Sequence, residues 1–210
     1  MCLNCMKSSG CGCGCGSSSN SNGCVNLGPF VAVDAACIQT PSPTGSIIPF
    51  SSGVTTVALA TLASGLAGTP SLIGFGTATP GVTITGNTLD LTGLVTEAFT
   101  VPRNGSITSI AASFTPTVGV SLLGSTTVKA QVYKAPAGSN VFTATNAAVN
   151  LAPAYTGAIT TGSTASASAT IPPVSVTQGD RLVMVYTIEP SGVAALQTLT
   201  GTASAGITIS

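Results

Sequence analysis

The chain has 210 residues, of which only 5% are charged; five Lys and Arg balance five Asp and Glu, and His and Trp are absent. Soluble domains carry about 25% charged residues, and a chain this poor in basic side chains cannot neutralise a run of phosphates, which excludes nucleic acid as a partner. The absence of His removes the usual general base and the most common metal ligand near neutral pH, so we expect neither an enzyme nor a bound cofactor.

The scarcity of charge needs a physical cause. A domain with no net charge and few surface ions tends to associate, so a membrane and a permanent assembly are the two environments to compare. A membrane-spanning helix needs ~20 mostly apolar residues, and the best window, residues 54–68, is shorter and contains Thr and Ser. The sequence therefore favours a subunit of an assembly, with copies of itself as partners and no membrane.

The N-terminal 37 residues are unusually rich in cysteine. Residues 8–24 contain only Ser, Gly, Cys and Asn, a composition that cannot build a core and predicts a flexible arm. The first residues lack a basic start followed by an apolar stretch, so no signal peptide is expected. All seven cysteines lie in this arm: Cys2, Cys5, Cys11, Cys13, Cys15, Cys24 and Cys37.

Four roles are open for these cysteines. Cys2 and Cys5 form one half of a zinc-binding pair, but no second pair follows at the usual distance. Disulfides within the arm are disfavoured because cysteines two apart in an extended chain point to the same side. Free thiols would persist in a reducing cytosol. We favour disulfides between chains, since a one-sided row and an odd count suit cross-linking.

Residues 25–34 form an apolar, β-prone segment that follows Cys24, and a Pro-rich linker at 38–46 begins after Cys37. Such an isolated strand can fold back on its own domain or add to the sheet of a neighbouring subunit. We expect docking on a neighbour, through Val25, Leu27, Phe30, Val31 and Val33. The resulting organisation is an arm (1–37), a linker (38–46) and one domain (47–210).

Residues 47–210 predict an all-β sandwich or barrel. Val, Ile, Thr and Ala dominate, and Gly or Pro recurs every 8–12 residues. We expect turns at Asn104-Gly105 and at 178–180. The expected strands are 54–61, 72–75, 82–85, 88–91, 95–101, 106–114, 119–122, 126–133, 165–171, 181–188, 196–200 and 206–209.

Two of these strands differ in the faces they present. In 126–133, apolar and polar residues alternate, which indicates one buried and one solvent-exposed face. In 181–188, both faces are largely apolar, so both need a cover. We expect another subunit to supply one cover and predict the trimer interface at Leu182, Met184, Tyr186 and Ile188.

Several short motifs carry a family resemblance. They are IPFSSG (48–53), SLIGFG (71–76), LDLTG (89–93), AFTVPRNGSITS (98–109), GDRL (179–182) and ASAGI (203–207). In this order, over residues 47–210, they resemble the C-terminal domain of collagen-like exosporium glycoproteins of spore-forming bacilli. The resemblance implies a C1q/TNF-like jelly roll, a homotrimer and a location on the endospore surface after synthesis in the mother-cell cytosol.

The arm stands where that family carries a Gly-X-Y collagen stalk. It resembles, more weakly, the N-terminal connectors of proposed spore-appendage pilins. Together the two resemblances imply a structural subunit of an endospore surface fibre or exosporium layer, with trimeric heads joined head-to-tail through the arm and locked by disulfides. Anchor and tip proteins are further possible partners. The alternative is a trimeric adhesin-like head that binds a sugar or a host surface.

Overall fold

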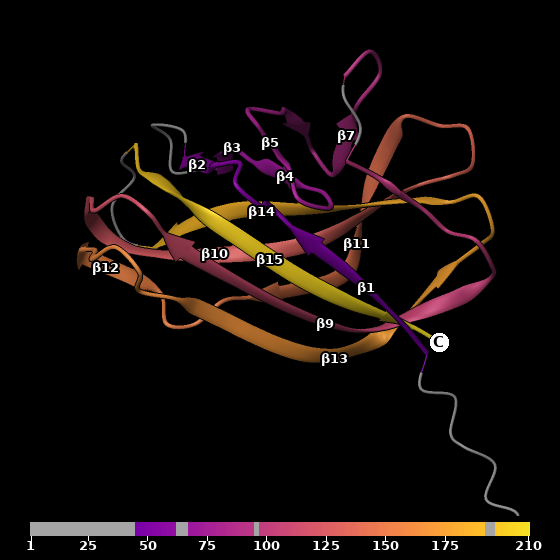
Figure 1. The fold of residues 1–210 in the computed structure, drawn as a ribbon. Coiled ribbons are helices and arrows are strands. Elements are labelled where there is room, and N and C mark those ends of the chain that lie inside the picture. The colour runs from indigo at the N-terminus through magenta and orange to yellow at the C-terminus, as the bar shows by residue number, and fades with distance from the viewer. Residues whose placement is uncertain (1–44, 62–66, 95–96, 192–195) are drawn as a thin grey trace, which may run out of the picture. The chain divides into compact units, whose positions relative to one another are not determined.

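The computed structural model describes residues 45–61, 67–94, 97–191 and 196–210 (Figure 1). They fold into an all-β jelly-roll sandwich of two curled antiparallel sheets, and they contain no helix. This confirms the expected fold class. The cysteine arm, its apolar segment and nearly all of the linker lie outside the described residues.

The first sheet, called sheet A here, is built around the C-terminal strand β15 (Thr198–Ile209). On one side β15 pairs with β9 (Gly105–Pro116), which pairs in turn with β13 (Ala165–Val176). On its other side β15 pairs with β1 (Ser46–Ser51) and, farther along, with β2 (Val57–Thr61). The short strand β3 (Ala67–Thr69) continues the sheet beyond β2.

The second sheet, called sheet B, is built around the long central pair β10 (Ser121–Ala135) and β14 (Arg181–Ser191). Beyond β14 lie β4 (Ser71–Ile73) and β5 (Ala78–Pro80), and β8 (Phe99–Thr100) also pairs with β14. Beyond β10 lie β11 (Val141–Asn150), β7 (Thr88–Asp90) and β6 (Ile84–Thr85), and β12 (Tyr155–Ala158) pairs with the start of β10.

The main core lies between the two sheets. In β10, Val128, Ala130 and Val132 are buried in it, whereas Lys129 and Gln131 between them are only half-buried. The expected alternation of this strand is therefore confirmed. The largest side chains that fill the core from sheet A are Phe50 and Phe114.

Strand β14 is where the structure corrects the sequence-based expectation. Leu182, Met184, Tyr186 and Ile188 point into the main core and are at most 1% exposed within a single chain. A second subunit cannot reach them, so they do not form a trimer interface.

The opposite face of β14 is covered by its own chain. Val183 and Val185 are fully buried in a second apolar cluster, to which Leu72, Leu89 and Phe142 contribute. The cover therefore comes from other residues of the same chain, in the curled strands β4, β7 and β11 and in the segments that carry Val82 and Leu91, and not from another subunit.

The two ends of sheet A differ. At one end, called the base, Ser46 pairs with Ile209, and the backbones of Ser106 and Ser210 bond to each other. The described chain starts here beside its C-terminus (Figure 1). At the opposite end, called the apex, Pro116 pairs with Gly201 and accepts a hydrogen bond from the Gly162 amide.

Candidate assembly surface

Charge is segregated between the two sheets. No strand of sheet A contains a charged residue. The charged residues of the described ranges lie on strands of sheet B or in loops: Asp90, Glu97, Arg103, Lys129, Lys134, Asp180, Arg181 and Glu189. Charged side chains reach sheet A at its base, where Arg103 bonds the Ser46 hydroxyl and Lys134 bonds the Ser175 carbonyl. The rest of the sheet can therefore be covered by another molecule without desolvating an ion.

The outer face of sheet A is defined by the side chains that point away from the core. Strand register places them in three rows that cross β1, β15, β9 and β13. The rows are Ile47, Thr208, Ser109 and Thr170; Pro49, Gly206, Ala111 and Ser168; and Ser51, Ser204, Ser113 and Ser166. All of these side chains are uncharged, and all except Ile47 are small.

Because the side chains are small, the outer face is hollowed. Shallow depressions of about 440 Å³, 380 Å³ and 260 Å³ adjoin one another along it. The first two share Ala111, Ser168 and Gly206, and the first and third share Ser113 and Ser204. Ile47 stands 74% exposed beside the second depression. A partner surface can thus approach the backbone of sheet A closely.

The outer face is supported from beneath by buried tyrosines. The Tyr186 hydroxyl donates to the carbonyl of Ser204 at 2.7 Å or of Ser113 at 3.2 Å. Burial raises the pKa of Tyr186, which keeps the hydroxyl a donor. Nearby, the Tyr155 hydroxyl bonds the carbonyls of Phe114 and Ser163 and the Ala165 amide. These contacts tie sheet B and the segment after β12 to the strands that carry the face.

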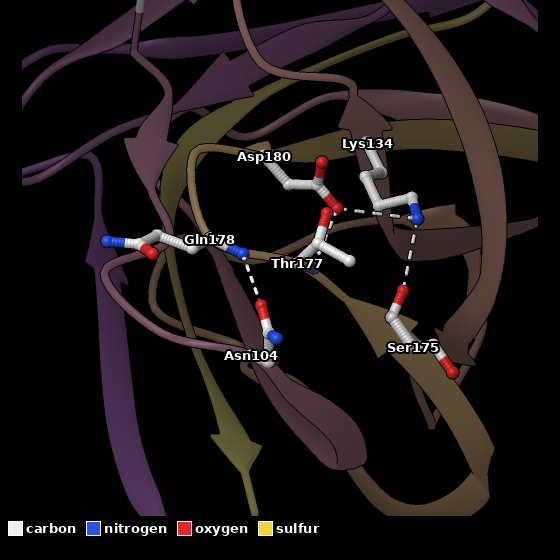
Figure 2. Close-up of polar contacts among 6 residues, drawn as sticks. All are labelled: Asn104, Lys134, Ser175, Thr177, Gln178 and Asp180. Carbon is white, nitrogen blue, oxygen red and sulfur yellow. Dashed lines mark hydrogen bonds and ion pairs between the residues drawn. The ribbon is translucent and has the colours of Figure 1, made fainter.

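The base is closed by a polar cluster (Figure 2). The Asp180 carboxylate accepts a hydrogen bond from the Thr177 amide at 2.9 Å and lies 3.6 Å from Lys134 Nζ. The same ammonium donates to the Ser175 carbonyl at 3.0 Å, and the Gln178 amide donates to Asn104 Oδ1 at 2.8 Å.

The charged groups of this cluster stabilise the fold. Desolvation raises the pKa of Asp180, but the hydrogen bonds from Thr177 and the charge of Lys134 outweigh it, so the pKa is lowered on balance. The carboxylate therefore stays ionised and holds the 177–180 turn, where Gly179 adopts a φ of 89°. That turn confirms the expectation for 178–180.

The other expected turn is wrong. Gly105 has no left-handed φ and instead begins β9, while the Asn104 side chain bonds to Gln178. A Cβ at Gly105 would lie 2.8 Å from the carbonyl oxygen of Ser210. This glycine is thus used for close approach to the C-terminus and not for a hairpin.

The remaining site expectations fall on the arm. The seven cysteines and the apolar segment with Val25, Leu27, Phe30, Val31 and Val33 lie outside the described residues. Among the residues that are described, no group of three His, Cys, Asp or Glu could hold a metal ion. The same residues contain no helix long and apolar enough to cross a membrane.

Comparison with known proteins gives one informative match. No family model matches the chain. The chain is 34% identical over 176 residues to "Collagen-like protein 1" of Acanthamoeba polyphaga mimivirus, over 79% of this chain and 19% of that protein. The chain is a homologue of a collagen-like protein. The match is too long to lie in the arm alone, so it includes most of the β domain.

The same match limits what can be transferred. The chain spans about a fifth of the length of this relative. The likeness to collagen-like proteins is thus supported by a homologue, whereas the likeness to exosporium glycoproteins rests on the short motifs of residues 47–210.

Proposed function

We propose that the protein is a structural subunit of a surface assembly, a fibre or layer on the endospore, whose heads are homotrimers held together by the outer face of sheet A. The observation that carries this proposal is the uncharged, hollowed face described above. The homologous collagen-like protein supports a structural role. The motif resemblance supports three as the number of subunits and the endospore as the location.

The size of the face suits a stable interface. Four strands about 4.8 Å apart, the longest with 12 residues, form a surface roughly 15 Å by 40 Å. Specific interfaces bury about 800 Å² per partner, which exceeds the flat area of about 600 Å² that these dimensions give, so the whole face and residues at its margins would be covered. Ser and Thr hydroxyls on it would need partners across the interface, and some are already paired, such as Ser113 with Ser204 at 2.9 Å.

The arm supplies the second level of assembly. Three arms on each trimer make docking multivalent, so weak single contacts combine into a firm joint. A head-to-tail contact does not close on itself and therefore propagates as a fibre. Disulfides between arm cysteines would then lock the joint after oxidation.

Gly206→Arg tests the trimer interface. Gly206 lies in the middle row of the face, and a Cβ there would meet only the Ile48 carbonyl oxygen, at 3.9 Å, so the fold tolerates a side chain. The full chain carries Phe30→Asp under reductant, so that docking through the arm is weakened. We expect this chain to sediment as a trimer, and the same chain with Gly206→Arg as a folded monomer. Thr85→Arg, an exposed position on sheet B, is the control and should stay trimeric.

Two results would contradict the proposal. Wild-type protein that sediments as a monomer at a concentration of tens of micromolar would contradict the trimer. A Gly206→Arg variant that is as trimeric as wild type would show that the subunits meet elsewhere. Circular dichroism on each variant confirms that the domain is folded.

A further inference from the structure

The apex of the domain carries exposed aliphatic side chains without nearby charge. Val118, Leu123 and Leu196 are 50%, 64% and 69% exposed. The described residues of the apex, 116–126, 158–164 and 196–201, contain no charged side chain. The closest charges along β10 and β14, Lys129 and Glu189, are paired with each other at 3.1 Å.

These three residues are held at one end of the sandwich by hydrogen bonds. The Gln197 side chain, which is 4% exposed, donates to the Leu123 carbonyl and accepts from the Thr126 hydroxyl. The Gln197 amide and carbonyl both bond to Thr61. The Thr117 amide donates to the Thr200 carbonyl at 3.0 Å. Leu123 and Leu196 are thus presented from a fixed framework, with Val118 one residue beyond Thr117.

The described chain begins at the other end. Gly45 precedes β1 at the base, where Ser46 pairs with Ile209, and 44 residues lie before it. The apolar segment 25–33 is separated from the domain by residues 34–45, which can span at most about 40 Å when fully extended.

The length of this connection indicates whether the segment binds the apex of its own chain or the apex of another copy. Strand β15 alone has 12 residues and spans about 40 Å from base to apex. The segment could reach its own apex only with a fully straight linker lying along the domain. A second copy placed with its apex against this base requires a far shorter span.

We propose that Val118, Leu123 and Leu196 form the docking point for residues 25–33 of a second copy, which stacks the heads apex to base. This inference rests on the proposed function and adds the surface that receives the arm. The segment brings Val25, Leu27, Phe30, Val31 and Val33 to an apolar, uncharged apex, so neither partner desolvates an ion.

The first test uses the full chain under reductant, so that disulfides do not contribute. Leu123→Asp and Leu196→Asp place a charge on the docking point. Thr85→Asp is the control, because Thr85 is exposed and lies on the edge strand β6 of sheet B, away from the apex and from the outer face of sheet A. We expect wild type and the control to form fibres in negative-stain micrographs. The two apex variants should remain dispersed trimers, as sedimentation would show.

The second test measures the contact directly. A labelled peptide of residues 25–36 is titrated into the full chain that carries Phe30→Asp, so that its own arms compete less. Fluorescence anisotropy should show binding that Leu123→Asp weakens at least tenfold and Thr85→Asp leaves unchanged. Leu196→Ser is a milder second variant, in case a charge at the apex disturbs folding.

The outcomes separate this inference from the proposed function. Fibres and peptide binding that persist in both apex variants would overturn the apex as docking point while leaving the trimeric subunit in place. Equal weakening by Thr85→Asp would overturn it too, because binding would then not be localised to the apex. A wild-type chain that forms neither trimers nor fibres would defeat the proposed function, and the docking inference with it.

Discussion

Tyr186 gives the sharpest test of which surface faces a neighbour. The side chain is fully buried between the sheets, and its hydroxyl bonds the Ser204 and Ser113 carbonyls. Tyr186→Phe removes only that hydroxyl. A hydrogen bond contributes a net stabilisation of about 0.5–1.5 kcal/mol. Ser113 and Ser204 are also paired with each other in the ladder of sheet A, so each keeps its other contacts when the hydroxyl is removed. We expect a loss of about 1 kcal/mol and an unchanged trimer.

Tyr186→Asp separates a core position from an interface position more strongly. It loses the aromatic ring, which costs about 3–5 kcal/mol for large core residues, and it buries a carboxylate without a cationic partner, which costs several kcal/mol more. The sum approaches the total stability of a typical domain, about 5–15 kcal/mol. We therefore expect an unfolded or aggregated chain and not a folded monomer.

Thermal unfolding followed by circular dichroism, at one fixed protein concentration, measures both variants. For a domain of this size 1 kcal/mol shifts the midpoint by about 2–4 °C, which is the decrease expected for Tyr186→Phe. Sedimentation reports the subunit number. A well-folded, monomeric Tyr186→Asp protein would refute the burial of this residue and restore β14 as a subunit contact.

Three further predictions concern other parts of the chain. Gly201→Ala should lose about 1–3 kcal/mol of stability by overpacking, because its Cβ would collide with the Thr115 carbonyl oxygen, whereas a Cβ at Gly206 in the same strand has room. Denaturant titration compares Gly201→Ala with Gly206→Ala, and equal stabilities would contradict the close approach. Asp180→Asn should cost about 1 kcal/mol at pH 7. Because the folded pKa of Asp180 is lowered, its contribution is present above the unfolded value of about 4 and disappears as the pH falls below it, so the gap between variant and wild type should close in acid; a constant gap would be inconsistent with this linkage. Finally, oxidised protein should run as a ladder on non-reducing gels that reductant collapses, and a single monomer band after complete oxidation would exclude cross-links between chains.

The strands could be predicted from sequence wherever side chains alternate or β-branched residues cluster. The prediction divided the residues of β10 and β15 into separate strands because glycines usually end strands. In β10, Gly124 adopts a φ of 85° where the register to β12 shifts, so the strand bends without ending. In β15, Gly201 continues the ladder, and glycine is needed there because the neighbouring strand leaves no space for a Cβ. Neither role of glycine can be predicted from the neighbouring residues in the sequence.

Other elements were missed because their signal is tertiary. Strand β11, with the sequence VFTATNAAVN, has little β-prone character beyond its first residues, and its pairing with β10 and β7 defines it. The short strands β1 and β12 likewise depend on β15 and β10. The two-sided apolar pattern of β14 correctly indicated two covers. It could not show that one of them consists of residues roughly 90 to 110 positions earlier in the chain, such as Leu89 and Leu72.

The low charge of the whole chain indicated an assembly but not a surface. Only the topology shows that β1, β2, β9, β13 and β15, which are scattered along the sequence, share one sheet and that none of them carries an ion. A chain with few charges spread at random would place some on each sheet. Their confinement to sheet B and the loops leaves one face that other copies can cover with little desolvation cost. The same face lacks the bulky side chains that would keep a partner's backbone away. Composition thus limits the class of function, whereas strand order selects the residues that would carry it.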